Sequence, residues 1–133
     1  MTQSTMPARQ SEFLTAAGLE LDEVTPARVA GHITLGPEHH TPWGIVHGGV
    51  YASAVESAAS LGASAAVEDK GLVAVGLTNT THFIGAVRSG RVAVTAVALS
   101  QGRTQQLWQV DITDQDGRLV AHGELRLQNI GNA

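Results

Sequence analysis

The sequence predicts an α+β fold in which a curved antiparallel β-sheet wraps around one long central helix. Three observations predict this class. The only long helix candidate, residues 48–66, carries a single charged side chain. Several strand candidates, separated by turns that contain glycine, follow this helix. Aromatic residues make up only 4% of the chain, so the core has to be built from small side chains that let a helix and a sheet approach closely.

Length and composition favour one domain, residues 1–133, with a flexible tail at residues 1–8. The hydrophobic fraction of 43% supports a packed core, and the net charge of −4 argues against a nucleic-acid partner. The absence of cysteine excludes disulfides, thiolate zinc sites and a cysteine nucleophile. The chain start has no apolar signal core, and no apolar run is long enough to span a membrane. We therefore expect a cytoplasmic protein without a membrane partner.

Upstream of the long helix, the pattern predicts a short helix, one strand and a loop. The short helix covers residues 9–18 and ends at Gly18, because glycine is favoured just beyond a helix end. Residues 19–35 predict a strand that bends near Pro26. Residues 36–46 are rich in turn-forming residues and predict a loop.

Strands are expected after the long helix, at residues 71–87, 91–100, 105–113 and 118–128. Ser89-Gly90 and Asp116-Gly117 predict hairpin turns, and Gln101-Gly102 ends the second of these strands. The strand at 91–100 is almost entirely apolar, which predicts burial on both faces. Alternation in the last two strands predicts inward-facing side chains at Trp108, Val110, Ile112, Leu119, Ala121, Gly123, Leu125 and Leu127.

The long helix is apolar on nearly every side, which is typical of a helix that is buried all round. Glu56 is its only charged residue, and no Lys or Arg stands three or four positions away. Burying an unpaired carboxylate costs several kcal/mol. Ser53, Glu56 and Ser60 form one polar stripe, which indicates a site or an interface. The alternative is that Glu56 is a partly exposed helix residue.

His47-Gly48-Gly49 stands at the start of this helix. Free backbone N–H groups and the helix dipole attract an oxygen that carries developing negative charge. The alternative is a flexible turn with no further role. An oxyanion donor together with a carboxylate suits the hydrolysis of an acyl compound.

One helix cannot easily bring the two groups together. Gly48 and Glu56 are separated by about 12 Å along the helix axis, whereas a reacting carbonyl must lie about 3 Å from both. Two antiparallel copies place the start of one helix beside the middle of the other. The spacing therefore predicts a two-fold dimer with shared sites.

The ordered set of motifs resembles the hotdog-fold acyl-CoA thioesterases, in the branch of the Arthrobacter-type 4-hydroxybenzoyl-CoA, phenylacetyl-CoA and 1,4-dihydroxy-2-naphthoyl-CoA thioesterases. The resemblance covers roughly residues 30–128. It is carried by TPWGIVHGG, the following VES, TNTTHF, RSGRV and LWQVDITDQDGRLVA. It implies a central helix in a curved sheet, and dimers that pair into homotetramers.

The resemblance also implies roles for individual residues. The N–H of Gly48, with that of Gly49, would polarise the thioester carbonyl. Glu56 of the facing subunit would be the nucleophile or the general base, and Ser60 would position the attacking group. His47 would orient the thioester or assist the departing thiol.

One position departs from the family pattern. Relatives often carry Gln or Asn where this chain has Thr41, and a hydroxyl reaches less far than an amide. Thr41, one of the preceding residues His39 and His40, or water would take over that role.

A net acidic protein needs local cations to bind the phosphates of CoA. The resemblance places CoA contacts at His82, Phe83, Ile84, Gly85, Ser100, Gln101, Gly102, Arg103 and Thr104. Arg91 and Arg88 are further candidates, although arginines at strand ends are also ordinary solvated charges. CoA would be part of the substrate, so no cofactor and no metal are expected.

Other functions have weaker support. The six histidines match no metal-ligand spacing, and HExxH, GxSxG, a P-loop and GxGxxG are all absent. The alternatives that stay open are a hotdog hydroxyacyl-CoA dehydratase and a non-catalytic acyl-CoA binding protein. The sequence thus predicts a homotetrameric acyl-CoA thioesterase for an aromatic, hydroxybenzoyl- or phenylacetyl-like acyl group.

Overall fold

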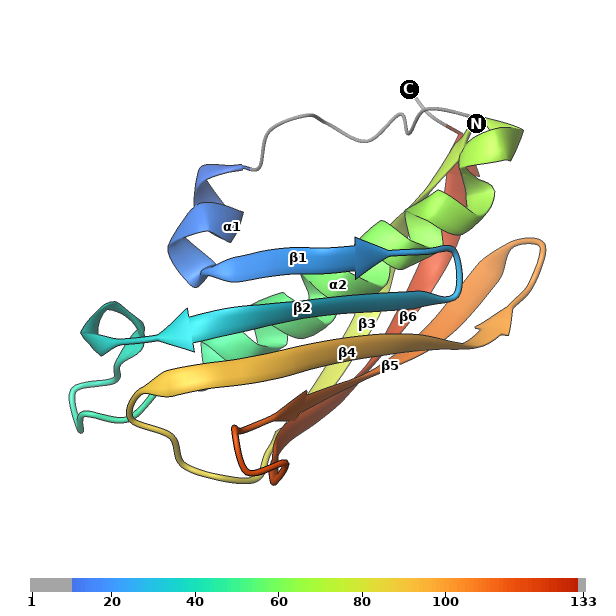
Figure 1. Ribbon diagram of the computed structural model, residues 1–133. Helices are drawn as coiled ribbons and strands as arrows, with labels where there is room; N and C mark the ends of the chain where they lie inside the picture. The colour runs from blue at the N-terminus through green and yellow to red at the C-terminus, as the bar shows by residue number, and fades with distance from the viewer. Residues whose placement is uncertain (1–10, 132–133) are drawn as a thin grey trace.

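The computed structural model describes residues 11–131 (Figure 1). The tail expected at residues 1–8, and the first residues of the helix expected at 9–18, lie outside the described residues. Within residues 11–131, no helix has the length and hydropathy that crossing a membrane requires. A single domain over residues 1–133 stays a prediction.

The first element is a short helix, α1, at Glu12–Ala17. Ser11 caps it, because the Ser11 side chain accepts a hydrogen bond from the Leu14 N–H at 3.2 Å. Gly18 ends it with a φ of 89°, a left-handed conformation that favours glycine. The predicted helix end at Gly18 is therefore confirmed.

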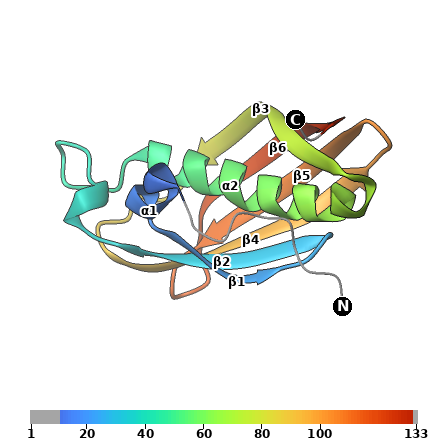
Figure 2. The ribbon, with the colours of Figure 1, turned by 90° about the horizontal axis from the view of Figure 1, so that it is seen from above.

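Six antiparallel strands form one sheet in the order β1-β2-β4-β5-β6-β3. They are β1 Leu19–Val24, β2 Arg28–Leu35, β3 Leu72–Phe83, β4 Gly90–Gln101, β5 Gln105–Thr113 and β6 Leu119–Gly131. The long helix α2, Gly48–Val67, runs across the inner face of the sheet, which curls around it (Figures 1 and 2). The described residues also form two single-turn helices, at Pro37–His39 and Glu68–Lys70. The predicted hotdog fold is confirmed.

Two strand predictions were wrong in their boundaries. Residues 19–35 form the hairpin β1-β2, because Pro26 lacks the N–H that a continuous strand needs. Thr25 closes the turn: its hydroxyl accepts from the Arg28 N–H at 2.9 Å. The strand expected at 71–87 ends at Phe83, after which the N–H groups of Ile84 and Gly85 both bond to the Val120 carbonyl.

The hairpin predicted at Ser89-Gly90 was also wrong. Gly90 has a φ of 103°, as such a turn requires, but β3 and β4 are not neighbours in the sheet. Strand β3 pairs with β6 instead, whereas β4 lies between β2 and β5. The turn at Asp116-Gly117 does join the paired strands β5 and β6, and Gly117 has a φ of 81°.

Helix α2 and strand β4 were both predicted to be buried on all sides, and each is buried on one side only. Within the described chain, α2 buries eight residues but leaves Glu56 exposed. Strand β4 buries Val92, Val94 and Ala96, whereas Ala93 and Leu99 are exposed. The reason is the architecture, because α2 covers only one face of a single-layer sheet.

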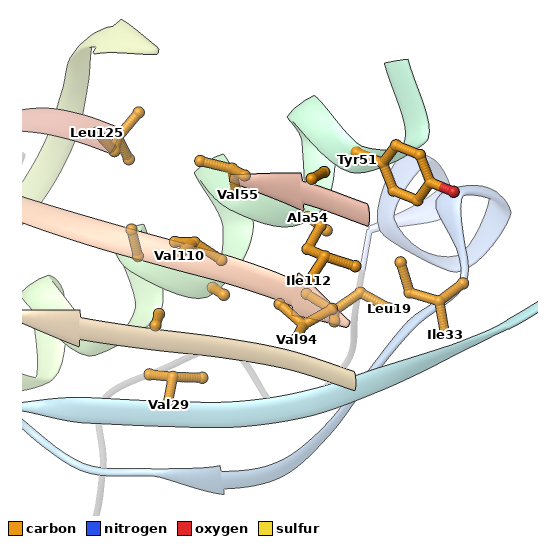
Figure 3. Close-up of a cluster of buried hydrophobic side chains, with 14 of the residues drawn as sticks. Leu19, Val29, Ile33, Tyr51, Ala54, Val55, Val94, Val110, Ile112 and Leu125 are labelled. Carbon is orange, nitrogen blue, oxygen red and sulfur yellow. The ribbon is translucent and has the colours of Figure 1, made fainter. Parts of the chain in front are cut away.

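The core between α2 and the sheet is built from small and branched side chains (Figure 3). A Cβ on Gly62 would lie 2.5 Å from the Trp108 ring, so the helix backbone rests directly on that ring. Residues Trp108, Val110, Ile112, Ala121, Gly123, Leu125 and Leu127 are buried as predicted. Leu119 is only half-buried, and its neighbour Val120 is buried instead.

The two edges of the sheet differ in character. Strand β1 is short and carries Glu20, Asp22 and Glu23, all exposed, which discourages pairing with another strand. Strand β3 has 12 residues and no Asp, Glu, Lys or Arg, and it exposes Val75 and Leu77. A long, uncharged edge with exposed apolar residues is suited to pairing with another copy.

Candidate active site

The start of α2 is fixed by His47, which is the N-cap residue. Its Nδ1 atom accepts a hydrogen bond from the Gly49 N–H at 2.7 Å. Because Nδ1 accepts, the neutral ring carries its proton on Nε2. The His47 side chain therefore presents an N–H group beside the start of the helix.

Gly48 differs from Gly49 in this respect. Within residues 11–131, the Gly48 N–H makes no hydrogen bond. The Phe83 ring packs against the Gly48 backbone so closely that a Cβ on Gly48 would lie 2.8 Å from it. The prediction that both glycines offer a free N–H is thus wrong for Gly49, whose N–H is used by the cap.

Glu56 lies two turns further along α2, and its side chain is exposed. Its Oε2 atom is 3.5 Å from the position that a Cβ on Gly76 of strand β3 would occupy. Within the described residues, Glu56 forms no ion pair or hydrogen bond. The premise of a buried, unpaired carboxylate is therefore wrong for a single chain, and the alternative of an exposed helix residue holds.

A cavity of about 380 Å³ lies beside the Glu56 side chain. Helix α1 and helix α2 form its walls, and β3 contributes one residue. The lining residues are Ser11, Phe13, Leu14, Ala52, Ser53, Glu56, Ser57 and Asn79. The carboxylate thus faces a space that a small ligand can occupy.

The predicted polar stripe on α2 divides into residues with different contacts. The Ser53 hydroxyl donates to the Gly49 carbonyl at 2.7 Å, so it supports the helix start. Ser57, which the stripe did not include, lines the cavity with Glu56. Ser60 is half-buried one turn beyond Glu56 and does not line this cavity.

Asn79 joins the edge strand to the middle of the helix. Its Nδ2 atom donates to the Ala52 carbonyl at 2.9 Å, and its Oδ1 atom accepts from the Thr81 hydroxyl at 2.7 Å. Ala52 is halfway between Gly48 and Glu56 along α2. This contact therefore fixes β3 against the centre of the candidate site.

The Thr41 hydroxyl accepts a hydrogen bond from the Trp43 N–H at 3.2 Å. The same turn is closed by the bond from the Thr41 N–H to the Ile45 carbonyl at 2.7 Å. Arg88 also holds this loop, through its Nη1 donation to the Gly44 carbonyl at 3.1 Å. These contacts give Thr41 a part in the loop that leads into α2.

The two histidines before Thr41 have structural contacts as well. His39 is buried, and its Nδ1 atom accepts from the Gly36 N–H at 3.2 Å. His40 bonds through Nε2 to the Arg88 carbonyl. Each contact uses one ring nitrogen and helps to hold the loop that precedes α2.

The residues predicted for CoA binding fall at two ends of the sheet. Phe83 is paired with Ala121, in the row next to Gly48. The turn at 100–104 instead adjoins Gln105, which pairs with Gln128 at the row of Val75. One chain therefore brings Phe83, Ile84 and Gly85 to the helix start but leaves Ser100, Gln101, Gly102, Arg103 and Thr104 at the other end.

Two of the predicted CoA residues have other positions or contacts than expected. His82 pairs with His122 on the outer face of the sheet, where the His122 Nδ1 lies 2.7 Å from Asp111 Oδ1. His82 thus faces away from α2. Gln101 donates to the Pro26 carbonyl at 2.7 Å and to Gln106 at 3.1 Å, which gives it a structural role.

A second cavity, of about 520 Å³, lies on the other side of α1 and is lined by residues such as Thr15, Gly18 and His39. It does not include Glu56. Tyr51, at the start of α2, is buried with a hydroxyl that has no partner in the described part of the chain, and burial raises its pKa. Among residues 11–131, no three His, Asp or Glu side chains gather as metal ligands would.

Sequence patterns missed the contribution of α1 to this site. Phe13 and Leu14 stand 42 or more positions before Glu56, and only the folding of α1 over α2 brings them together. The polar run around Asn79, within a strand that begins apolar, was a usable signal because it marks where β3 faces the cavity.

Comparison with known proteins identifies the class. The Thioesterase superfamily matches residues 44–121. Protein Rv1847 of Mycobacterium tuberculosis is 41% identical over 120 residues, which cover 89% of this chain and 86% of that protein. Its structure superposes with a TM-score of 0.89 at 40% identity, over 92% of this chain and 99% of that one. The chain therefore belongs to the Thioesterase superfamily.

Two further relatives agree with this assignment. The 1,4-dihydroxy-2-naphthoyl-CoA hydrolase of Listeria monocytogenes is 31% identical over 103 residues, or 77% of this chain and 83% of that protein. The structure of thioesterase HI1161 from Haemophilus influenzae superposes with a TM-score of 0.83 at 28% identity, over 90% of this chain and 82% of that one. The chain is an enzyme of the thioester hydrolase class.

Proposed function

We propose that this enzyme hydrolyses an aromatic acyl-CoA thioester to the free acid and CoA, with Gly48 of one chain and Glu56 of its partner in each active site. The observation that carries the proposal is that the Gly48 N–H has no hydrogen-bond partner among residues 11–131 and starts the same helix that presents Glu56 to a cavity. The Listeria relative is named for an aromatic acyl-CoA, which supports this substrate class.

The shared site is inferred from two segments that match in space: Gly48 to Glu56 on α2 runs alongside Phe83 to Gly76 on β3. The Phe83 ring packs on Gly48, and Glu56 lies over Gly76. The midpoint of Gly48 and Glu56 is Ala52, and the midpoint of Gly76 and Phe83 falls beside Asn79, which is bonded to Ala52. A two-fold axis at this contact brings the partner's Glu56 toward Gly48.

The free edge of β3 supplies the surface for such a dimer. Residues directly opposite each other in an antiparallel pair point to the same face of the sheet. Asn79 and Thr80 are consecutive in the strand and point to opposite faces, so one cannot lie opposite the other. A two-fold pairing therefore sets Asn79 opposite the partner's Asn79, or Thr80 opposite the partner's Thr80. Either register extends the sheet across both chains and keeps the two helices antiparallel. Such dimers would pair into the homotetramer expected from the family.

The chemistry follows from the polar groups. As the carbonyl carbon is attacked, its oxygen becomes an oxyanion that the Gly48 N–H stabilises. Glu56 either attacks directly, forming an anhydride that water then hydrolyses, or removes a proton from an attacking water, and Ser60 positions the attacking group. In both routes the carbon–sulfur bond breaks as the tetrahedral intermediate collapses, before any anhydride is hydrolysed. The His47 Nε2–H donates a hydrogen bond to the departing sulfur, and the proton that completes the thiol comes from the attacking water, through Glu56 or solvent. Thr41 holds the loop that positions His47.

The antiparallel dimer also brings together the two segments predicted to bind CoA, which lie at opposite ends of the sheet in one chain. It moves the turn at 100–104 of one chain toward Ile84 and Gly85 of the other, because opposite ends of β3 become neighbours. Arg91 and Arg103 are exposed and are assigned to the CoA phosphates. The reaction uses no cofactor or metal. A cytoplasmic location stays a prediction.

The test is free-thiol release from a panel of acyl-CoAs: benzoyl, 4-hydroxybenzoyl, phenylacetyl, dihydroxynaphthoyl, short-chain and long-chain. Wild type is compared with Glu56→Ala and Glu56→Gln, and with Glu124→Gln as a control, because Glu124 is exposed on the outer face of β6. We expect release from the aromatic thioesters that both Glu56 variants abolish and the control retains. Full activity of Glu56→Ala would contradict the mechanism, and binding without thiol release would indicate a non-catalytic acyl-CoA binder.

A further inference from the structure

We propose that α1 forms the wall of the acyl pocket and that the Phe13 ring stacks on the acyl group, which makes Phe13 the residue that selects planar acyl groups. This inference rests on the proposed function, since it names what the cavity beside Glu56 accepts. It concerns a part of the chain that the resemblance to known thioesterases did not cover.

The contacts of the cavity carry the first step. Helix α1 contributes Phe13 and Leu14 to its lining, and the cap residue Ser11 adds a third side chain, opposite the residues of α2. Figure 2 shows α1 lying over the amino-terminal half of α2. Phe13 is 66% exposed although it lines the cavity, so much of its ring is available to a ligand. An aromatic residue that the core does not use is therefore presented beside the carboxylate.

The placement of α1 is fixed at both ends. Ser11 caps its start, and Gly18 turns the chain from α1 into β1 with a φ of 89°. A Cβ on Gly18 would lie 3.0 Å from the His39 Nε2 atom and 3.2 Å from Ile33, so the turn is pressed against the body of the protein. No residue of α1 is fully buried, so core packing is not what positions its side chains.

The opposite wall explains why the preferred group is planar. Ala52, Ser53 and Ser57 of α2 have small side chains, whereas Phe13 has a flat ring. A planar acyl group lying between these walls contacts the ring over its whole face and stays within reach of Glu56. Stacked or edge-to-face aromatic pairs gain energy beyond the area they bury, which a short aliphatic chain does not.

The test compares Phe13→Ala and Phe13→Leu with wild type, using benzoyl-CoA and butyryl-CoA as substrates. Phe13 is exposed, so its truncation does not open the core. For Phe13→Ala we expect kcat/KM on benzoyl-CoA to fall roughly tenfold, mainly through KM, while butyryl-CoA changes less than about twofold. Phe13→Leu restores apolar contact without a ring, so it recovers less than half of the loss on benzoyl-CoA.

The matched control is Thr15→Ala, on the same helix but lining the other cavity. If α1 acts through Phe13, Thr15→Ala keeps the wild-type ratio of kcat/KM for benzoyl-CoA to kcat/KM for butyryl-CoA. Equal losses on both substrates in Phe13→Ala, or no loss on either, would overturn the inference while leaving thioester hydrolysis intact. A wild-type chain that released thiol from no acyl-CoA would instead overturn the proposed function, and this inference with it.

Discussion

The His47 Nδ1 atom accepts a hydrogen bond of 2.7 Å from the Gly49 N–H, so the two glycines at the start of α2 are not equivalent. The Gly49 N–H is bonded in the cap, whereas the Gly48 N–H has no hydrogen-bond partner in the described chain. The cap also fixes the His47 ring with its proton on Nε2. One contact therefore sets both the oxyanion donor and the hydrogen-bond donor to the departing sulfur in the proposed mechanism.

Gly48→Pro removes the proposed oxyanion donor while keeping the helix start. Gly48 is the first residue of α2, a position where proline is well tolerated. We expect kcat to fall about 100- to 1000-fold, the usual effect of losing such a donor. Gly48→Ala is the control, since it adds a Cβ against Phe83 but keeps the N–H. Equal losses in the two variants, measured by thiol release, would show that crowding by Phe83 and not the N–H matters.

Substitution of His47 separates its capping role from its hydrogen bond to the departing sulfur. His47→Ala loses the cap, which is worth about 1 kcal/mol of the free energy of unfolding. His47→Asn supplies another capping acceptor, so thermal unfolding should recover while kcat stays at least about tenfold low. Recovery of both the unfolding temperature and kcat in His47→Asn would limit His47 to a structural role.

Asp114 stabilises the β5-β6 hairpin in a pH-dependent manner. The Arg118 N–H bonds to its carboxylate at 2.9 Å and, with the Asp116 N–H and the Arg118 side chain, lowers the Asp114 pKa from its ordinary value of 3.8. A lowered pKa means that the stabilisation is present above pH 3.8 and is lost as the pH falls through the folded-state pKa. Asp114→Ala should thus unfold at a lower temperature than wild type at pH 7. In thermal melts below pH 3, the difference should shrink; a constant difference would refute the charge effect.

Crosslinking tests which edge of the sheet joins two chains. The protein has no cysteine, so single substitutions give unambiguous products. Thr80→Cys lies on β3 and Asp22→Cys on the acidic edge strand β1. With a short bis-maleimide we expect a covalent dimer from Thr80→Cys and none from Asp22→Cys. The reverse result would place the interface on β1.

The central helix could be predicted well because its signals are local. The sequence predicted residues 48–66, and α2 spans Gly48–Val67. The turn at Gly117 was predictable for the same reason, since a φ of 81° favours glycine whatever surrounds it. Local patterns sufficed wherever neighbours in sequence decide the conformation.

The order of the strands could not be predicted in this way. Gly90 has the positive φ of a hairpin turn, yet β3 crosses to the far edge of the sheet and pairs with β6. That position depends on contacts between distant residues, such as Asn79 with Ala52. A dipeptide that suits a hairpin carries no information about which strand its neighbour will meet.

The site was predictable in part. The separation of Gly48 and Glu56 follows from helix geometry, and so did the expectation of a second chain. The exposure of Glu56 and the contribution of α1 to the cavity wall could not be predicted from the sequence, because both depend on how distant segments pack. Phe13 stands in a short helix without buried residues, so its sequence context is that of an ordinary surface position.

The most direct test of the shared site is to co-express Glu56→Ala with Gly48→Pro and measure thiol release from benzoyl-CoA. Each variant alone should be nearly inactive. In a mixed dimer, one site combines the intact Gly48 of the first chain with the intact Glu56 of the second. Random pairing should then restore about a quarter of the wild-type activity. A mixture as inactive as its parents would contradict the account, because it would mean that Gly48 and Glu56 act within one chain or not together at all.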